Sequence, residues 1–232
     1  MPSVEEILIA DIEGIRLGHA QDLQAGTGCT VILCERGATA GIDVRGGAPA
    51  TRESDLLNPV NLVDKVHAVL LAGGSAFGLD AAAGVMEYLE ERGVGFDVQV
   101  ARVPIVCGAA LFDLAFGDPR VRPDKEMGRR ACRDAERGGC AAGNVGAGTG
   151  ATVGKIRGMA RAMKGGLGCH ALQVGALRIG ALVAVNCLGD VIDPATGERL
   201  AGLLTEDLTA LADTEAVMVA SYGERKNVFA GN

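Results

Sequence analysis

Residues 66–93 read VHAVLLAGGSAFGLDAAAGVMEYLEERG, and this stretch decides the fold class. The apolar run VHAVLLA ends in two glycines, which predicts a buried strand followed by a tight turn. The next segment has apolar residues at the spacing of one helix face: Leu79, Ala82, Met86 and Leu89. Ser75 is a suitable N-cap for this helix, and Gly93 is a typical stop. A buried strand that leads directly into a helix predicts a layered α/β protein.

The segments on either side contain further strands and one more helix. Strand-like runs are GIRLGHA (14–20), CTVILCE (29–35), TAGIDVRG (39–46) and VGFDVQVARVPIV (94–106). The first of them are separated by turn signals, which favours an antiparallel start to the sheet. The segment PDKEMGRRACRDAERGG (123–139) predicts an exposed, charge-rich helix with Pro123 near its start.

The second half contains two long apolar runs, GLGCHALQV (166–174) and LRIGALVAVNCLGDVI (177–192). Gly175 and Ala176 separate them, so the pair predicts a long hairpin. The second run is almost entirely apolar, which predicts a central strand covered on both faces. The segment TEDLTALADTEAVM (205–218) favours a helix, although its Thr residues weaken that prediction.

The composition predicts one compact domain over residues 1–232 and excludes several classes of protein. Hydrophobic residues make up 48% and the mean hydropathy is +0.24, so disorder is excluded. A net charge of −7 and 3% aromatic residues argue against binding to nucleic acid. No uncharged apolar run reaches the roughly 18 residues of a membrane span. The first ten residues have no basic region typical of a signal peptide, and seven Cys without a CxxC pair indicate reduced thiols. We therefore expect a cytoplasmic protein.

The glycine-rich segment GNVGAGTGATVGK (143–155) is the main candidate for chemistry. Gly146, Gly148 and Ala151 have GxGxxA spacing, but no strand precedes them and no acidic residue follows about 20 residues later, which argues against a dinucleotide site. A P-loop is excluded because only three residues separate Gly150 from Gly154 and Ile156 follows Lys155. The remaining interpretation is a tight loop that brings Lys155 and several backbone N–H groups to a reacting centre.

No convincing nucleophile or metal site accompanies this loop. GGSAFG (73–78) resembles a nucleophile elbow, but Phe77 stands where that motif requires Gly. His19, His67 and His170 are widely spaced and have no ligand-like neighbours, so the pattern does not favour a metal site. No cofactor is predicted.

Several long motifs in order resemble the P1 peptidase family, also called L-aminopeptidase/D-esterase or DmpA-like. They are residues 12–35, 41–59, 66–93, 102–106, 111–118 and 143–168. The resemblance implies a four-layer αββα sandwich of the N-terminal-nucleophile hydrolase type, made from a precursor that cuts itself before a Ser or Thr. This chain would be the larger fragment, cut after Asn232, and the smaller partner fragment would begin with the nucleophile Thr. Further assembly into a homo-oligomer of this heterodimer is also implied.

The same resemblance assigns roles to individual residues. Lys155 would lie near the nucleophile, and Asn186 would donate a hydrogen bond to the oxyanion. Phe77 takes a place where some relatives have Tyr, and Gly146, Gly148 and Thr149 would join it in the substrate pocket. The implied reaction is hydrolysis of N-terminal amino-acid amides or oligomeric amides through an acyl-enzyme, with the substrate left open. Two alternatives stay open: an acyltransferase similar to the ornithine acetyltransferases, and a non-enzymatic glycine-rich binding protein.

Overall fold

The structure, a computed structural model, describes residues 3–138 and 141–224. Its largest sheet has five strands in the order β2-β3-β5-β8-β4. The strands are β2 (Arg16–Asp22), β3 (Thr27–Ala38), β4 (Thr51–Arg52), β5 (Val66–Ala72) and β8 (Val106–Ala110). Strands β5 and β8 run parallel, whereas the other neighbours are antiparallel. The buried strand predicted at the start of residues 66–93 is confirmed as β5, and the structure places it in the middle of this sheet.

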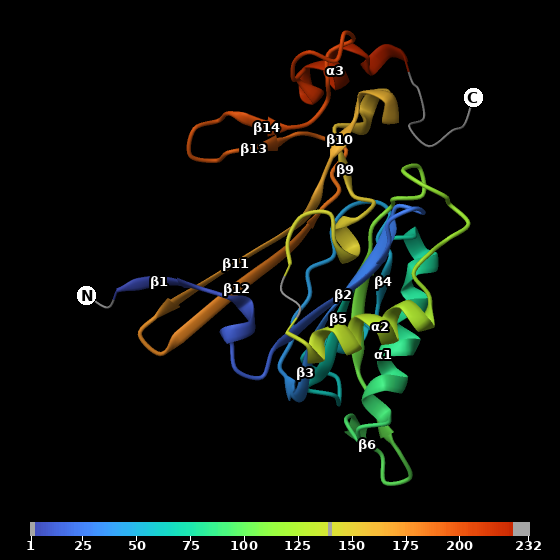
Figure 1. Ribbon diagram of the computed structural model, residues 1–232, viewed down its shortest axis with the longest axis vertical. Coiled ribbons are helices and arrows are strands. Elements are labelled where there is room, and N and C mark those ends of the chain that lie inside the picture. Colours follow the sequence, from blue (N-terminus) through green and yellow to red (C-terminus); the bar gives the residue numbers. More distant parts are fainter. Residues whose placement is uncertain (1–2, 139–140, 225–232) are drawn as a thin grey trace.

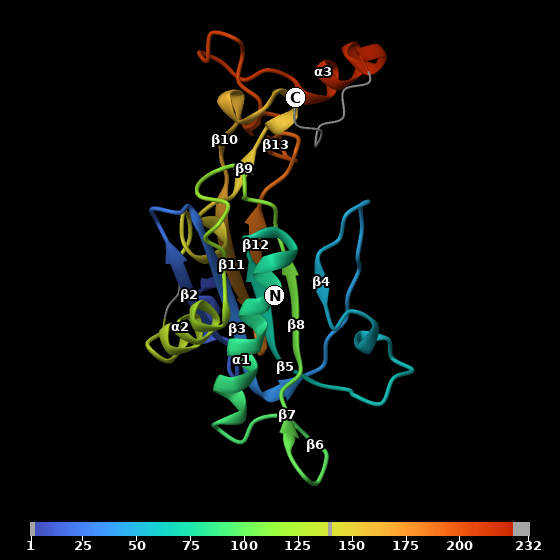
Figure 2. The same ribbon diagram turned by 90° about the vertical axis from the view of Figure 1, so that its right-hand side faces the viewer.

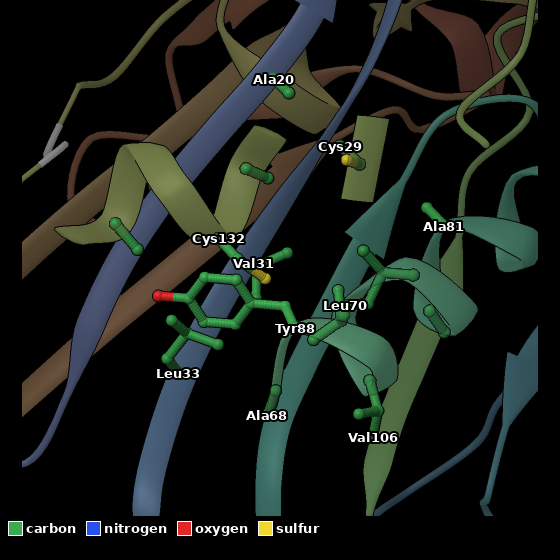
Figure 3. Close-up of a cluster of buried hydrophobic side chains, with 14 of the residues drawn as sticks. Ala20, Cys29, Val31, Leu33, Ala68, Leu70, Ala81, Tyr88, Val106 and Cys132 are labelled. Carbon is green, nitrogen blue, oxygen red and sulfur yellow. The ribbon is translucent and has the colours of Figure 1, made fainter. Parts of the chain in front are cut away.

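Two helices, α1 (Ala81–Glu90) and α2 (Lys125–Glu136), cover one face of this sheet (Figures 1 and 2). They approach closely at glycines: a Cβ on Gly84 would lie 1.8 Å from Lys125 O, and one on Gly128 would lie 2.0 Å from Ala81 O. The core between helices and sheet is built mainly from small aliphatic side chains, with Tyr88 as its one large aromatic ring (Figure 3). The many Ala and Gly residues of the sequence thus allow the layers to pack closely.

A second sheet has the order β1-β11-β12, and all its neighbours are antiparallel. Its strands are β1 (Val4–Ile7), β11 (Gly166–Val174) and β12 (Leu177–Val185). The predicted hairpin is confirmed, with its turn at Gly175. The prediction that its second strand is central and covered on both faces is wrong for the described residues, because β12 is an edge strand there. Ile179 and Val183 are 58% and 55% exposed.

The glycine-rich segment lies between the two sheets. Its 3₁₀ turn η4 (Gly146–Gly148) contacts β2 and β3 of the first sheet and β11 and β12 of the second. The Thr30 hydroxyl of β3 accepts a hydrogen bond from Ala147 N at 3.1 Å. This position is on the sheet face opposite the two helices, because the neighbouring residue Val31 points into the helix-side core.

Short elements complete the described chain, and those after η4 cluster at one end of the molecule (Figure 1). The short elements before η4 are η1 (Ile9–Asp11), η2 (Asp55–Leu57), η3 (Ser75–Asp80), β6 (Phe96–Asp97) and β7 (Arg102–Val103). Those after η4 are β9 (Thr152–Val153), η5 (Lys155–Arg157), η6 (Met159–Arg161), β10 (Met163–Lys164), β13 (Val191–Ile192), β14 (Arg199–Ala201), α3 (Thr214–Ala220) and η7 (Tyr222–Glu224). No helix in the described part of the chain is long and apolar enough to cross a membrane.

The predicted start of the first helix is wrong. Ser75 does not cap it: Ser75 has φ 56, and its backbone N–H donates to Leu111 O at 2.9 Å. The 3₁₀ turn η3 comes first and α1 begins at Ala81. The chain turns so tightly here that a Cβ on Gly78 would lie 1.8 Å from Gly73 O. The stop at Gly93 is confirmed, since this residue has φ 66 and its N–H donates to Glu90 O.

Three further predictions fail in part. Residues 39–46 form no strand, because β3 continues to Ala38 and the chain after it runs exposed without a pairing strand in the described residues. Residues 94–103 form the short β6–β7 hairpin instead of one strand. The helix predicted at 205–218 starts only at Thr214, where the Asp213 side chain caps it through Ala216 N. Side-chain hydrogen bonds such as Thr205 to Asp207 hold the preceding segment in turns.

Candidate active site

Lys155 and Asn186, both predicted site residues, lie together at the end of the hairpin. The Lys155 ammonium donates to Asn186 Oδ1 at 2.9 Å and to Asn186 O at 3.1 Å. Lys155 opens η5 directly after Gly154, which has φ 70, and Asn186 directly follows β12. A Cβ on Gly154 would lie 2.0 Å from Gly202 C, so only glycine allows the loop to pass this point. The tertiary fold thus pairs a cation with an amide 31 residues away in sequence.

The hydrogen bonds fix the orientation of the Asn186 amide. Its Oδ1 accepts from Lys155 and also from Thr152 N at 3.0 Å, so the oxygen must face these two donors. Its Nδ2 donates to Phe112 O at 3.0 Å. A carboxamide nitrogen carries two N–H donors, and the Phe112 carbonyl uses one of them. Asn186 can therefore offer the second N–H to a substrate oxygen.

The environment of Lys155 favours a less basic amine than usual. Burial lowers its pKa, while the nearby Cys187 and Asp113 act in the opposite direction. Among the described residues its three N–H donors make two hydrogen bonds, both to Asn186, so the third can serve a reacting group. The neighbouring Cys187 is a poor nucleophile, because burial raises the pKa of its thiol and the thiol donates to Gly189 O at 3.2 Å.

Asp113 is a buried carboxylate beside this pair that the sequence analysis missed. It is 4% exposed and accepts hydrogen bonds from the Thr27 hydroxyl at 2.8 Å and from Gly74 N at 2.6 Å. Burial raises its pKa, and the hydrogen bonds together with Lys164 oppose that shift. A Cβ on Gly73 would lie 2.0 Å from Asp113 Oδ2, and one on Gly150 would lie 2.6 Å from it. The available signal was the segment LFDLAFGD, an acidic residue within an apolar run.

Lys164 is the second residue that the sequence analysis missed. Its ammonium donates to Thr149 O at 2.9 Å and to Ala151 O at 2.6 Å, and it lies 4.4 Å from the centre of the Phe116 ring. Burial lowers its pKa, while Asp113 raises it. The site therefore contains two half-buried lysines on either side of one strand of the glycine-rich loop. The signal was a second lysine, followed by Gly-Gly, nine residues after the end of the loop at Lys155.

The other predicted residues have different positions. Phe77 lies on η3, is 58% exposed, and has the Arg122 guanidinium 3.7 Å from its ring centre. Gly146, Gly148 and Thr149 are buried, and the Thr149 Oγ1 has no hydrogen-bond partner among the described residues. These residues shape the loop backbone, and their place in a substrate pocket stays a prediction. Asn232 lies outside the described residues.

An open hollow of about 270 Å³ adjoins Lys164 at the start of the hairpin. Its lining is mostly apolar and glycine-rich: Val153, Lys164, Gly165, Gly166, Leu167, Gly168, Val185, Val191 and Ala201. Within residues 3–138 and 141–224, no group of three or more His, Cys, Asp or Glu side chains could hold a metal ion. Four of the cysteines, Cys29, Cys34, Cys107 and Cys132, are buried in the described part of the chain.

Fold and site together define a layered α/β protein with a lysine–asparagine pair at the end of its hairpin. The chain belongs to Peptidase family S58, whose sequence profile matches residues 8–220. It is 47% identical over 205 residues to an uncharacterized aminopeptidase of Mycobacterium leprae, covering 82% of this chain and 55% of that protein. It is 35% identical over 192 residues to a 6-aminohexanoate-oligomer endohydrolase of Kocuria sp. (strain KY2), covering 83% of this chain and 51% of that protein.

Solved structures share the fold. The L-aminopeptidase D-Ala-esterase/amidase from Ochrobactrum anthropi, described as a variant of the Ntn hydrolase fold, superposes with a TM-score of 0.60 at 19% identity. The match covers 77% of this chain and 54% of that one. The α/β class and the family resemblance are thereby confirmed. The chain spans about half the length of the curated relatives it matches.

Proposed function

We propose that this chain provides the lysine–asparagine half of an amide hydrolase of the N-terminal-nucleophile type. The observation that carries the proposal is the half-buried Lys155, which donates hydrogen bonds to Oδ1 and O of Asn186. Beside it, the second N–H of Asn186 Nδ2 has no hydrogen-bond partner in the described part of the chain and can bind an oxyanion. Membership of a peptidase family supports it, and so do relatives named aminopeptidase and oligomer endohydrolase.

The nucleophile in this proposal is a Thr at the start of a second segment, which corresponds to the part of the relatives' length that this chain does not cover. A free α-amino group has a pKa of about 8, so it can accept the proton of its own hydroxyl at neutral pH. The hydroxyl oxygen attacks the amide carbonyl, the amine leaves with the proton, and water then releases the acyl group. The charge of Lys155 would lower the pKa of that α-amino group, and Asn186 Nδ2 would stabilise the oxyanion.

The second segment would also cover the open face of the second sheet. Leu177, Ile179 and Val183 alternate along β12 and point to one side, where they are more than half exposed. Val4 of β1 continues this apolar surface at the other edge of the sheet. Exposed apolar surface of this kind is costly in water and marks an interaction site. Helices packed on this face would complete the four-layer αββα sandwich.

The test uses the full-length gene product. Intact-mass measurement should show two chains, one ending at Asn232 and one beginning with Thr. The product should hydrolyse at least one substrate in a panel of L-amino-acid amides, β-amino-acid amides, D-alanine esters and 6-aminohexanoate oligomers. Lys155→Ala should abolish hydrolysis while leaving a folded protein, because it removes the cation next to the reacting group. A Lys155→Ala variant with a wild-type kcat, or a wild-type protein that hydrolyses none of the panel, would contradict the proposal.

A further inference from the structure

Lys164 has surroundings that a surface lysine would not have. It pairs with Thr152 across the short β9–β10 ladder, and its half-buried ammonium donates to two carbonyls of the glycine-rich loop, Thr149 O and Ala151 O. The Phe116 ring lies against it at 4.4 Å, and a cation held over an aromatic face is further stabilised. Holding a lysine partly out of water costs free energy, so three separate contacts compensate for one desolvated charge.

One of these contacts leads directly to Asn186. The Ala151 carbonyl and the Thr152 N–H belong to the same planar peptide group and point in opposite directions. Lys164 binds the carbonyl side at 2.6 Å, and Asn186 Oδ1 accepts from the N–H side at 3.0 Å. A cation on the carbonyl polarises the peptide group and strengthens its N–H as a donor. The orientation of this peptide group therefore couples Lys164 to Asn186.

The other end of the Asn186 amide is linked to the same charge. Asn186 Nδ2 donates to Phe112 O, and the next residue is the buried Asp113. The Asp113 carboxylate and the Lys164 ammonium attract each other. Gly150, the loop residue between the two carbonyls that Lys164 binds, packs against the Asp113 side chain. The Thr152 N–H and the Phe112 carbonyl, which bond the two ends of the Asn186 amide, thus belong to backbone that Lys164 and Asp113 hold in place.

From this arrangement we infer that Lys164 is a positioning residue for the proposed amide hydrolysis, acting through the Ala151–Thr152 peptide group on the Asn186 amide. The inference rests on the proposed function, because Asn186 is given its role there. In this role Lys164 acts through the peptide group and not by contact with substrate or nucleophile. The Ala151 carbonyl keeps a second hydrogen bond, from Gly165 N at 2.8 Å, so loss of Lys164 removes one of two restraints and the polarising charge. Thr152 N then becomes a weaker donor to Asn186 Oδ1, and the oxyanion N–H is held less firmly in its direction.

The first experiment measures kcat and KM of the full-length protein with Lys164→Met, corrected for the fraction of titratable active sites. We expect kcat to fall about tenfold to a hundredfold, the size of one lost charge-assisted hydrogen bond, while KM changes little. Lys164→Arg keeps the cation and should recover most of the activity. Lys125→Met is the matched control, since it removes an ion-paired lysine on α2 and should leave both constants unchanged. If Lys164→Met is insoluble, the neutral Lys164→Gln takes its place throughout.

The second experiment separates positioning from a purely structural role. In an Asn186→Ala background, Lys164→Met should change kcat by less than about twofold, because residues that act through one contact are non-additive. A full, additive loss in that background would overturn the inference, and so would an unchanged kcat for both Lys164→Met and Lys164→Gln.

A crystal structure of Lys164→Met provides a readout that does not depend on activity. The hydrogen bond from Thr152 N to Asn186 Oδ1 should lengthen from its 3.0 Å, because its donor is no longer polarised by the cation. An unmoved Asn186 would refute the inference. If the wild-type protein hydrolyses no amide, the proposed function fails while this structural test of the Lys164–Asn186 coupling still stands.

Discussion

The Asn186→Asp substitution tests the donor end of the Asn186 amide apart from its acceptor end, which removal of the whole side chain would not do. The variant keeps the shape and an oxygen that can accept from Lys155 and Thr152 N. It replaces Nδ2, the donor to Phe112 O, by an acceptor. Asn186→Asp therefore tests whether an N–H at this position stabilises the transition state, with the rest of the network in place.

The expected effects on stability and on catalysis differ greatly in size. The lost bond to Phe112 O costs about 1 kcal/mol, and the carboxylate gains an ion pair of similar size with the half-buried Lys155. The melting temperature should therefore change by only a few degrees. Loss of an oxyanion donor costs about 3 to 4 kcal/mol of barrier. The kcat should fall by about a hundredfold to a thousandfold, with further loss from the negative charge next to the oxyanion.

The assay compares kcat, KM and melting temperature of the full-length wild-type and variant proteins on the best amide of the panel. Asn58→Asp is the matched control. Among the described residues the Asn58 side chain only accepts, from Val60 N, so the substitution makes the same chemical change without removing a donated hydrogen bond, and Asn58 lies on the exposed segment after η2. A kcat for Asn186→Asp within about tenfold of wild type, or an effect confined to KM, would show that Nδ2 does not bind the oxyanion.

Three further predictions follow from the geometry. Because burial raises the Asp113 pKa, its contribution to stability falls as pH rises from about 4 through that raised value. The melting temperature of Asp113→Asn relative to wild type should therefore increase between pH 4 and 7, and a pH-independent difference would contradict this. Gly150→Ala would place a Cβ 2.2 Å from Gly26 O and should lower the free energy of unfolding by about 1–3 kcal/mol or more, measured by thermal melting. Gly41→Ala is its control, because a Cβ there meets nothing within 4 Å and should leave the stability unchanged. Ile179→Arg should reduce soluble, assembled protein in size-exclusion chromatography if a second segment covers β12, and equal yields for Ile179→Arg and Val60→Arg would refute that cover.

Local sequence signals were reliable where one physical rule dominated. The apolar runs at 29–35 and 66–72 became the adjacent strands β3 and β5, because each buries its side chains on both faces. The helix at 123–139 was predicted from its charge pattern and from Pro123 near its start, and in the structure α2 begins at Lys125 with Asp124 as its cap. The helix start at Ser75 was misplaced, because the close approach of Gly78 to the Gly73 carbonyl and the bond to Leu111 O outweigh local capping preference.

The sequence by itself determined the α/β class, the hairpin at 166–185 and the family, and the family resemblance named Lys155 and Asn186 as candidates. Hydrophobic periodicity is a local signal, and the family motifs occur in order along the whole chain. Both can therefore be recognised without the structure. Only the tertiary structure decided which side of Asn186 donates and which accepts, and it alone revealed Asp113 and Lys164. Their roles depend on contacts between residues far apart in sequence, such as Thr27 with Asp113 and Asn186 with Phe112. A buried charge takes its chemistry from the groups that the fold places around it, and no spacing in the sequence encodes those neighbours.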